Sequence, residues 1–241
     1  MNTDNETILK VEHVDLGYGT LQVIFDVSLE VKKGELVGLV GGNGSGKSTM
    51  LRAVSGMIRP WKGEIYFQGE SILGLEPHQL AERKLAHVPM GRQLFTNLSV
   101  KENILLGSYL PRARVNRQEN YDRVMGIFPD LKKFENHSAG ALSGGQQQMV
   151  AIGRALMLEP ELLIMDEPSL GLSPLYVKQM MSAIRSLADM GFSVLLVEQN
   201  IKQVLQVSHR TYVLENGKLV LNGNSQELIG HPMIKKAYLG L

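Results

Sequence analysis

One stretch of this chain fits the phosphate-binding loop pattern G-x-x-x-x-G-K-S/T at every required position: Gly41, Gly42, Asn43, Gly44, Ser45, Gly46, Lys47, Ser48 and Thr49. The apolar run 36–40 before it predicts a short buried strand, and helical spacing after it predicts a helix that ends at Gly56. The glycines therefore lie where strand becomes helix, so backbone N–H groups and the positive end of the helix dipole point at an anion. A chance match in a chain of this length has odds on the order of one in a hundred.

Two side chains of the loop carry specific roles in this pattern. Lys47 is placed to reach the β- and γ-phosphates of a nucleotide, and the Ser48 hydroxyl is placed to bind Mg²⁺. The sequence therefore predicts binding of a nucleotide phosphate. Which nucleotide is bound, and for what purpose, stays open at this point.

Length and composition exclude several classes of protein. At 241 residues the chain is large enough for one α/β domain and too short for two nucleotide-binding units. The formal net charge of +1 gives no field for non-specific nucleic-acid binding, and the absence of cysteine excludes disulfides and thiolate metal sites. No apolar stretch approaches the ~20 residues that cross a bilayer, and residues 1–6 are polar. We expect a soluble, cytoplasmic protein that a partner docks at any membrane it serves.

Apolar patterning divides the first two thirds of the chain. Short alternating runs from 8 to 31 predict strands, and 63–70 predicts a hairpin with Trp61 packed at its entry. From 89 to 159 the period lengthens and becomes helical, with breaks at prolines and glycine. This segment is predicted to be a helical insertion between strands of a core.

A second buried strand ends in two acids. The apolar run 162–165 is followed by Asp166 and Glu167, and another apolar run, 193–197, follows a helical pattern over 177–188. Alternating strands and helices imply a parallel sheet with right-handed crossovers. The two carboxylates are therefore expected at the carboxyl edge of that sheet, where open α/β sheets bind ligands.

A second motif, Leu142-Ser143-Gly144-Gly145-Gln146, opens a predicted helix. Alone it is compatible with another glycine turn, but five specified residues match by accident in on the order of one in a few thousand chains. The pentapeptide is the signature of the ATP-binding cassette family, and the order of phosphate loop, signature and Asp-Glu strand resembles that family over essentially the whole chain. The resemblance implies an α/β fold: a P-loop NTPase with a RecA-like parallel-sheet core, an N-terminal antiparallel β subdomain and an inserted helical subdomain.

The resemblance also implies a shared site. In the family, two cassettes face each other head to tail and hold ATP between the phosphate loop of one and the signature of the other. Ser143 and the amides of Gly144 and Gly145, with Gln146 beside them, open a helix, and such a terminus suits the γ-phosphate. Tyr18, which alone is more simply a locally packed turn residue, becomes the expected adenine-stacking residue.

By the same resemblance, the acids and one amide complete the catalytic set. Asp166 is expected to hold Mg²⁺, mostly through water, and Glu167 to orient or deprotonate the attacking water. Gln199 aligns with the family's switch histidine, and it can donate a hydrogen bond but cannot carry charge. Lys47 belongs to this set through its phosphate contacts.

The chain departs from the family pattern at two further positions. Met90 aligns with the glutamine that contacts Mg²⁺ in most cassettes, and a thioether cannot replace an amide on a hard cation. Gln93 or water is the expected substitute. Ser173 stands where the loop after the base usually carries aspartate.

Five further sequence segments are similar to those of a narrower group, the shorter ATP-binding subunit of branched-chain amino acid importers. These segments are 153–157, 166–174, 196–200, 212–217 and 236–240. That family implies permease subunits in the membrane, a second cassette, and an external solute-binding protein. The second cassette is a different chain or a further copy of this one. The chain is then expected on the inner face of the cell membrane. An importer of urea and short-chain amides is the alternative.

Rival classes fit less well. Cassette ATPases acting on nucleic acid or ribosomes resemble tandem cassettes or carry a long coiled-coil insertion, and this chain has neither a second cassette nor a basic footprint. A kinase or GTPase leaves the signature unexplained. No nucleic-acid partner is therefore expected.

We expect the surface that couples to the permease around 91–106, where Leu94, Phe95 and Leu98 are apolar; the alternative is that they pack under the insertion. The whole chain is predicted to be one nucleotide-binding domain, 1–241. Its expected divisions are 8–88 and 160–225 for the core with the β subdomain, 89–159 for the helical subdomain, and 226–241 for a C-terminal helical tail.

Overall fold

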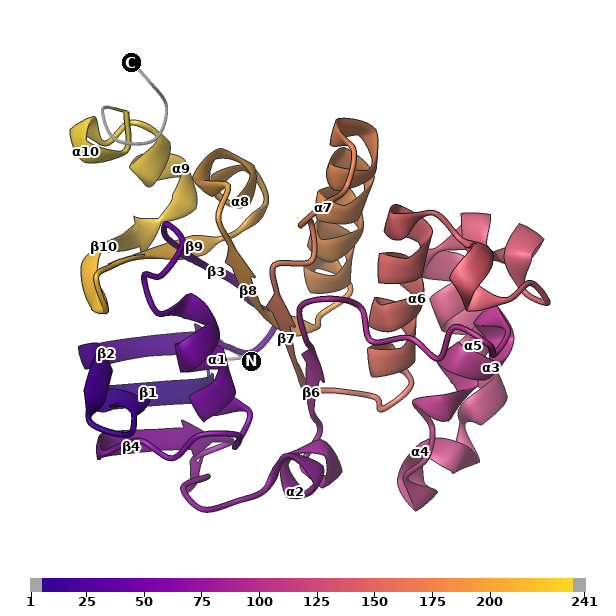
Figure 1. Ribbon diagram of the computed structural model, residues 1–241, viewed down its shortest axis with the longest axis horizontal. Coiled ribbons are helices and arrows are strands. Elements are labelled where there is room, and N and C mark those ends of the chain that lie inside the picture. The colour runs from indigo at the N-terminus through magenta and orange to yellow at the C-terminus, as the bar shows by residue number, and fades with distance from the viewer. Residues whose placement is uncertain (1–5, 236–241) are drawn as a thin grey trace, which may run out of the picture.

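The computed structural model describes residues 6–235, and its strands are β1 (Thr7–Tyr18), β2 (Leu21–Lys32), β3 (Leu36–Val40), β4 (Lys62–Phe67), β5 (Glu70–Ser71), β6 (Leu85–Val88), β7 (Leu162–Asp166), β8 (Ser193–Glu198), β9 (Arg210–Glu215) and β10 (Lys218–Asn224). They form two sheets (Figure 1), one antiparallel in the order β2-β1-β4-β5 and one in the order β10-β9-β3-β8-β7-β6. In the second sheet β10 is antiparallel to β9, and the other neighbours are parallel. The carboxyl ends of β3, β7 and β8 therefore meet at one edge.

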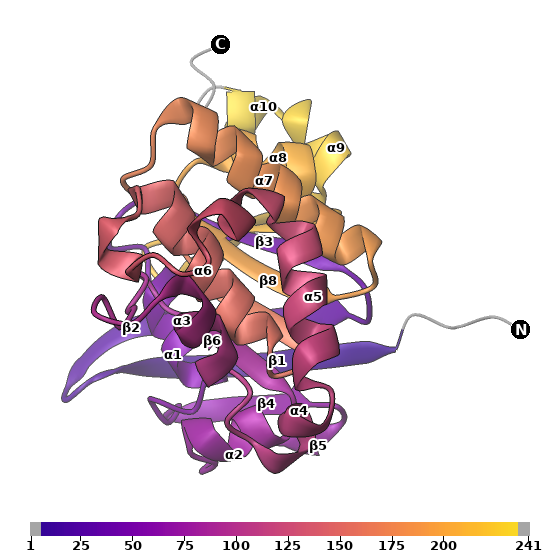
Figure 2. The same cartoon turned by 90° about the vertical axis from the view of Figure 1, so that its right-hand side faces the viewer.

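The helices are α1 (Lys47–Val54), α2 (Pro77–Glu82), α3 (Val100–Leu106), α4 (Pro111–Val115), α5 (Arg117–Ile127), α6 (Gly144–Leu156), α7 (Pro174–Asp189), α8 (Ile201–Val207), α9 (Ser225–Ile229) and α10 (Pro232–Ile234), with 3-10 turns η1 (Pro129–Phe134) and η2 (Ala139–Ala141). Figure 2 shows α3, α4, α5 and α6 gathered in front of the sheets. They form the predicted insertion between β6 and β7. The predicted fold class is confirmed, while the subdomain boundaries in the chain stay predictions.

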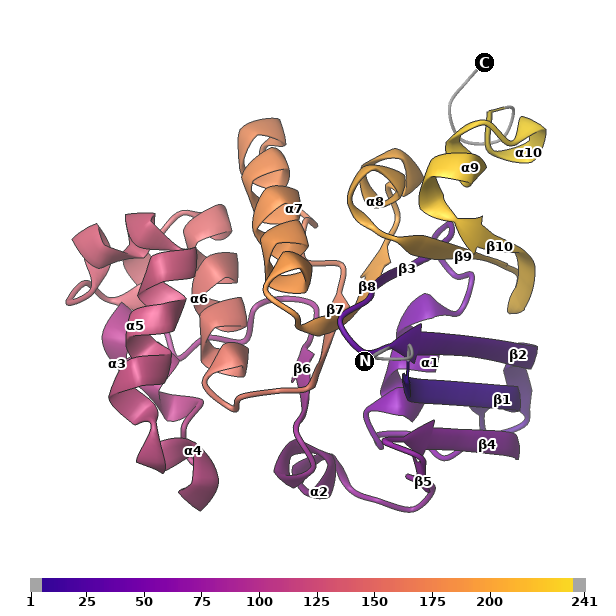
Figure 3. The same cartoon turned by 180° about the vertical axis from the view of Figure 1, so that it is seen from behind.

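The parallel strands are buried on both faces, which explains their nearly continuous apolar sequences. On β3, Leu36 and Val40 pack in one hydrophobic cluster, whereas Val37 and Leu39 pack in another. The first cluster includes residues of α6, α7 and α8, and the second includes residues of α1 and of the antiparallel sheet. Each face of the central sheet is thus covered by a different layer, as the view from behind also shows (Figure 3).

The antiparallel sheet differs from the prediction in two ways. Its first two strands, β1 and β2, are 12 residues each rather than short, because they continue through irregular positions at His13 and Asp26, where φ is positive. Trp61 is not a packing anchor: it is 44% exposed. Its backbone N–H donates to the Asp15 carbonyl, which fixes the residue at the margin of the sheet.

The predicted C-terminal tail contains α9 and α10, and residues 236–241, including the 236–240 segment, lie outside the described residues. Within residues 6–235 no helix has the length and apolar character to cross a membrane.

Candidate active site

The phosphate loop joins β3 to α1 in a conformation that requires glycine. Gly46, the N-cap of α1, has φ +105°, and a Cβ there would lie 2.5 Å from Ile24 Cδ1. At Gly41 a Cβ would lie 2.2 Å from the Leu214 carbonyl oxygen, a backbone atom that cannot move aside. Gly44 also has positive φ. The loop can therefore bring its backbone N–H groups toward an anion only with these glycines.

Lys47, the first residue of α1, folds back over its own loop. Its ammonium donates to the Gly41 carbonyl at 2.9 Å and to the Gly42 carbonyl at 3.1 Å. It also lies 3.3 Å from Glu167 Oε1, and both side chains are buried. The cation is thus held between the phosphate loop and the strand that ends in acids.

The two predicted acids take different positions. Asp166, at the end of β7, accepts a hydrogen bond from Ser48 Oγ at 3.0 Å, and burial raises the pKa of its carboxyl. Glu167 follows with φ +45°, and its N–H donates to the Val197 carbonyl at 2.9 Å. That backbone turn directs the carboxylate of Glu167 toward Lys47 rather than along the strand.

Gln199 connects the acid to the loop. Its Nε2 donates to Glu167 Oε2 at 3.0 Å and also to Asn43 Oδ1. The structure therefore brings together Lys47, Glu167 and Gln199, three residues that are far apart in the sequence, at the edge where β3, β7 and β8 end.

The sequence reasoning did not identify Glu198, the last residue of β8. It is 3% exposed and accepts hydrogen bonds from two backbone N–H groups, those of Ser169 and Gln199. The sequence does carry a sign of this residue, because an acid at the end of an otherwise apolar strand is the same pattern that predicts Asp166 and Glu167 at the edge of the sheet.

Tyr18 ends β1 and is 44% exposed. Its hydroxyl accepts a hydrogen bond from Arg52 at 2.9 Å and lies 3.4 Å from Thr49 Oγ1. The ring is therefore held beside α1, next to the phosphate loop. Its contact with a base stays a prediction.

The signature opens α6 with a capping box. Ser143 Oγ accepts the Gln146 N–H, and Gln146 Oε1 accepts the Ser143 N–H. A Cβ at Gly145 would lie 2.4 Å from the Tyr176 ring, so glycine is required there. Within residues 6–235 no hydrogen bond or ion pair joins Ser143 or Gln146 to the phosphate loop, and Ser143 is exposed.

The structure does not bring Gln93 together with the proposed magnesium ligands. Its carbonyl accepts a hydrogen bond from Arg154, and the residue lines a groove with Phe95 and Leu106. None of the hydrogen bonds among the described residues joins its side chain to Ser48 or Asp166. Its φ is +47°, and a magnesium role for Gln93 remains a proposal from the sequence.

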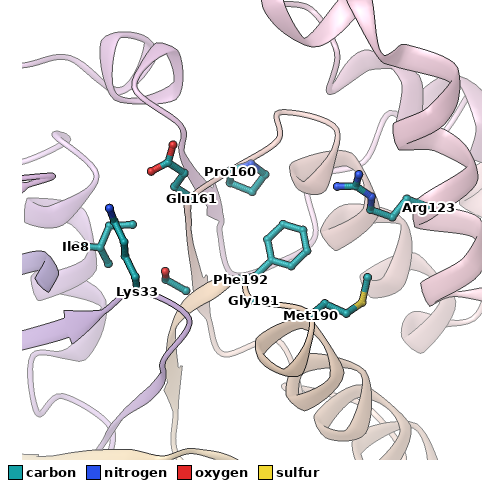
Figure 4. A pocket seen from close by; sticks show the side chains of 9 residues that line it. Ile8, Lys33, Arg123, Pro160, Glu161, Met190, Gly191 and Phe192 are labelled. Atoms are coloured by element: carbon teal, nitrogen blue, oxygen red, sulfur yellow. The ribbon is translucent and has the colours of Figure 1, made fainter. Parts of the chain in front are cut away.

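A pocket of about 430 Å³ opens at the opposite edge of the sheet, where β3, β7 and β8 begin (Figure 4). Lys33, Glu161 and Phe192 line it, and Arg123 reaches it from α5. None of its lining residues belongs to the phosphate loop, the acid pair or the signature. The motif residues thus define a site separate from this hollow.

Comparison with known proteins identifies the family. The model of the ABC transporter family matches residues 24–170. The chain belongs to this family. The high-affinity branched-chain amino acid transport ATP-binding protein BraG of Pseudomonas aeruginosa is 43% identical over 233 residues, covering 97% of this chain and 100% of the relative. The lipopolysaccharide export system ATP-binding protein LptB of Acidithiobacillus ferridurans is 33% identical over 234 residues, covering 97% of each.

Solved structures agree with this assignment. The ADP conformation of an ATP-binding cassette of an ABC transporter has a TM-score of 0.84 and 27% identity, covering 98% of this chain and 99% of that one. A dimeric cassette in a post-hydrolysis state, bound to ADP and phosphate, has a TM-score of 0.76 and 27% identity, covering 90% and 98%. This ABC protein is therefore an ATPase subunit that binds ATP and couples its hydrolysis to transport.

Proposed function

We propose that this chain is the ATPase subunit of an importer for branched-chain or other neutral, hydrophobic amino acids. The observation that carries the ATPase part is the contact of Glu167 with both Lys47 and Gln199 at the carboxyl edge of the sheet. The amino acid part is supported by the 43% identity to BraG along nearly the whole chain, against 33% to LptB.

Each of the site residues then has a separate role in ATP binding or hydrolysis. Lys47 and the loop 41–49 grip the β- and γ-phosphates, and Tyr18 stacks on adenine. Glu167 orients or deprotonates the attacking water, and Gln199 holds that carboxylate through its amide. Since phosphoryl transfer asks little covalent chemistry of the protein, positioning and charge stabilisation supply most of the rate.

The residues around Ser48 fit Mg²⁺. Its hydroxyl and an Asp166 oxygen lie 3.0 Å apart, and these are hard oxygen donors of the kind Mg²⁺ takes alongside phosphate oxygens and water. Burial raises the pKa of the Asp166 carboxyl, and a cation beside it would favour the charged form. When bound, Mg²⁺ neutralises the negative charge on the phosphates.

Two partners follow from surfaces that this chain leaves incomplete. The exposed start of α6 at Ser143 suits the nucleotide of a second cassette, a different chain or another copy of this one, and the dimeric cassette of known structure supports such a pairing. A groove of about 460 Å³ lined by Phe95, Leu106 and Tyr109, each at least 41% exposed, suits an apolar segment of a permease. Such docking would hold the chain at the inner face of the membrane, with an external solute-binding protein as an indirect partner and no nucleic acid.

The experiment is solute uptake by proteoliposomes holding this chain and the permease subunits encoded beside it. We expect ATP-dependent accumulation of radiolabelled leucine, and none with Glu167→Gln, which should still bind ATP. Uptake of urea instead would support the short-chain amide alternative. Normal uptake by Glu167→Gln would remove Glu167 from the role of base.

A further inference from the structure

Glu198 is a carboxylate in an apolar strand. The five residues of β8 before it are buried, and Glu198 itself is 3% exposed. Among residues 6–235 no lysine, arginine or histidine forms an ion pair with it, and burial raises the pKa of its carboxyl. Burying a carboxylate without a cation costs free energy unless hydrogen bonds satisfy it. The hydrogen bonds of Glu198 must therefore offset the cost of its burial.

Each carboxylate oxygen of Glu198 accepts one backbone N–H. Oε1 accepts from Ser169 at 2.8 Å, and Oε2 accepts from Gln199 at 3.3 Å. Ser169 lies two residues after Glu167 in the loop that leads to α7, whereas Gln199 begins the segment after β8. A single side chain therefore ties the two segments that carry Glu167 and Gln199.

These contacts close a ring. The side chains of Glu167 and Gln199 are hydrogen bonded to each other at 3.0 Å, and the Glu198 carboxylate bonds the backbone N–H of Gln199 and that of Ser169, two residues after Glu167. The Glu167 N–H also donates to the Val197 carbonyl, which fixes the same acid to the strand that ends in Glu198. The ring sets both the distance and the direction of the Glu167 carboxylate.

We propose that Glu198 is a positioning residue for ATP hydrolysis, acting through Glu167 and Gln199 without touching the nucleotide. The proposal rests on the roles given to those two residues under the proposed function. A misplacement of about 1 Å at a reacting group costs on the order of a hundredfold in rate, so loss of the link should lower turnover while nucleotide binding by Lys47 and its loop persists.

The test is Glu198→Gln in the complex reconstituted for uptake, with kcat, KM for ATP and the Kd of a fluorescent ATP analogue measured together. The glutamine keeps the volume, but its oxygen accepts one N–H and its NH₂ faces the other donor. We expect kcat to fall at least about tenfold while KM and Kd change less than about twofold. Glu35→Gln is the matched control: it weakens a carboxylate–Arg210 contact at the amino edge of the sheet, and we expect it to leave kcat unchanged.

Gln199→Ala and the double variant with Glu198→Gln add a readout that a purely structural role would not produce. Because both residues act on Glu167, the kcat of the double variant should be about the same as the kcat of the slower single variant. Unchanged kcat in Glu198→Gln, a loss matched by equal rises in KM and Kd, or losses that simply multiply would each overturn the proposal. An active Glu167→Gln would instead overturn the proposed function, so the two failures are distinguishable.

Discussion

The histidine beneath the apolar groove should make stability depend on pH. His87 lies on β6, and both of its ring nitrogens are buried without a hydrogen-bond partner among the described residues. Burial lowers the pKa of its imidazole from 6.5 to about 4. Between pH 6.5 and 4, His87 is therefore neutral in the folded protein and protonated in the unfolded chain. The stabilisation is complete above pH 6.5 and is lost as the pH falls toward 4.

The size of the effect follows from the shift. Each pH unit between the two pKa values is worth about 1.4 kcal/mol, so roughly 2 kcal/mol of the free energy of unfolding should be lost between pH 7.5 and pH 5. His87→Leu removes the titrating group and keeps an apolar side chain of similar size. As the pH falls from 7.5 to 5, the free energy of unfolding of His87→Leu should therefore rise by roughly 2 kcal/mol relative to that of the natural chain.

Urea unfolding followed by circular dichroism at pH 7.5, 6 and 5 measures this difference. His78→Leu, at an exposed position of α2, is the control for replacing any histidine by leucine. If the free-energy difference between the natural chain and His87→Leu is the same at all three pH values, the imidazole is not titrating against its burial and the reasoning fails.

Two further predictions concern the surfaces around the site. Met90→Gln restores the amide that most cassettes carry, and we expect Mg²⁺-dependent ATP turnover to rise by up to about tenfold; no change in a magnesium titration would mean that water already fills that position. Phe95→Asp places a charge in the apolar groove, where Phe95 is 57% exposed, and should weaken binding to detergent-solubilised permease by about 2 kcal/mol or more, with Val115→Asp, exposed on α4, as control. Equal retention of the two variants on immobilised permease would show that the groove is not the docking surface.

Local patterns predicted the elements well where one face or both faces of a strand are buried. The strand before the phosphate loop, the helix after it, the acid-ended strand and the helix at Ser143 are all confirmed by the structure. Met180 and Met181, which lie in the helical pattern over 177–188, are 0% and 4% exposed. These successes share a cause, since periodicity and capping residues are properties of neighbours in the chain.

The failures concern partners from distant segments. The link made by Glu198 depends on Ser169, which belongs to another segment, and Trp61 is 44% exposed although its backbone N–H bonds the Asp15 carbonyl of β1. Gln93 or water was the expected substitute for the amide that Met90 lacks, and among the described residues the Gln93 side chain has no hydrogen bond to Ser48 or Asp166, so this magnesium role stays a prediction. Side-chain direction in a loop depends on φ and tertiary contacts, which no periodic pattern contains.

The Lys47–Glu167 pair has a consequence for when the site becomes reactive. At 3.3 Å the ammonium partly cancels the charge of the carboxylate, and it also bonds two carbonyls of its own loop. An incoming triphosphate competes for that same ammonium. ATP binding would then release the Glu167 carboxylate, the proposed base, from its ion pair at the moment when the nucleotide enters the site.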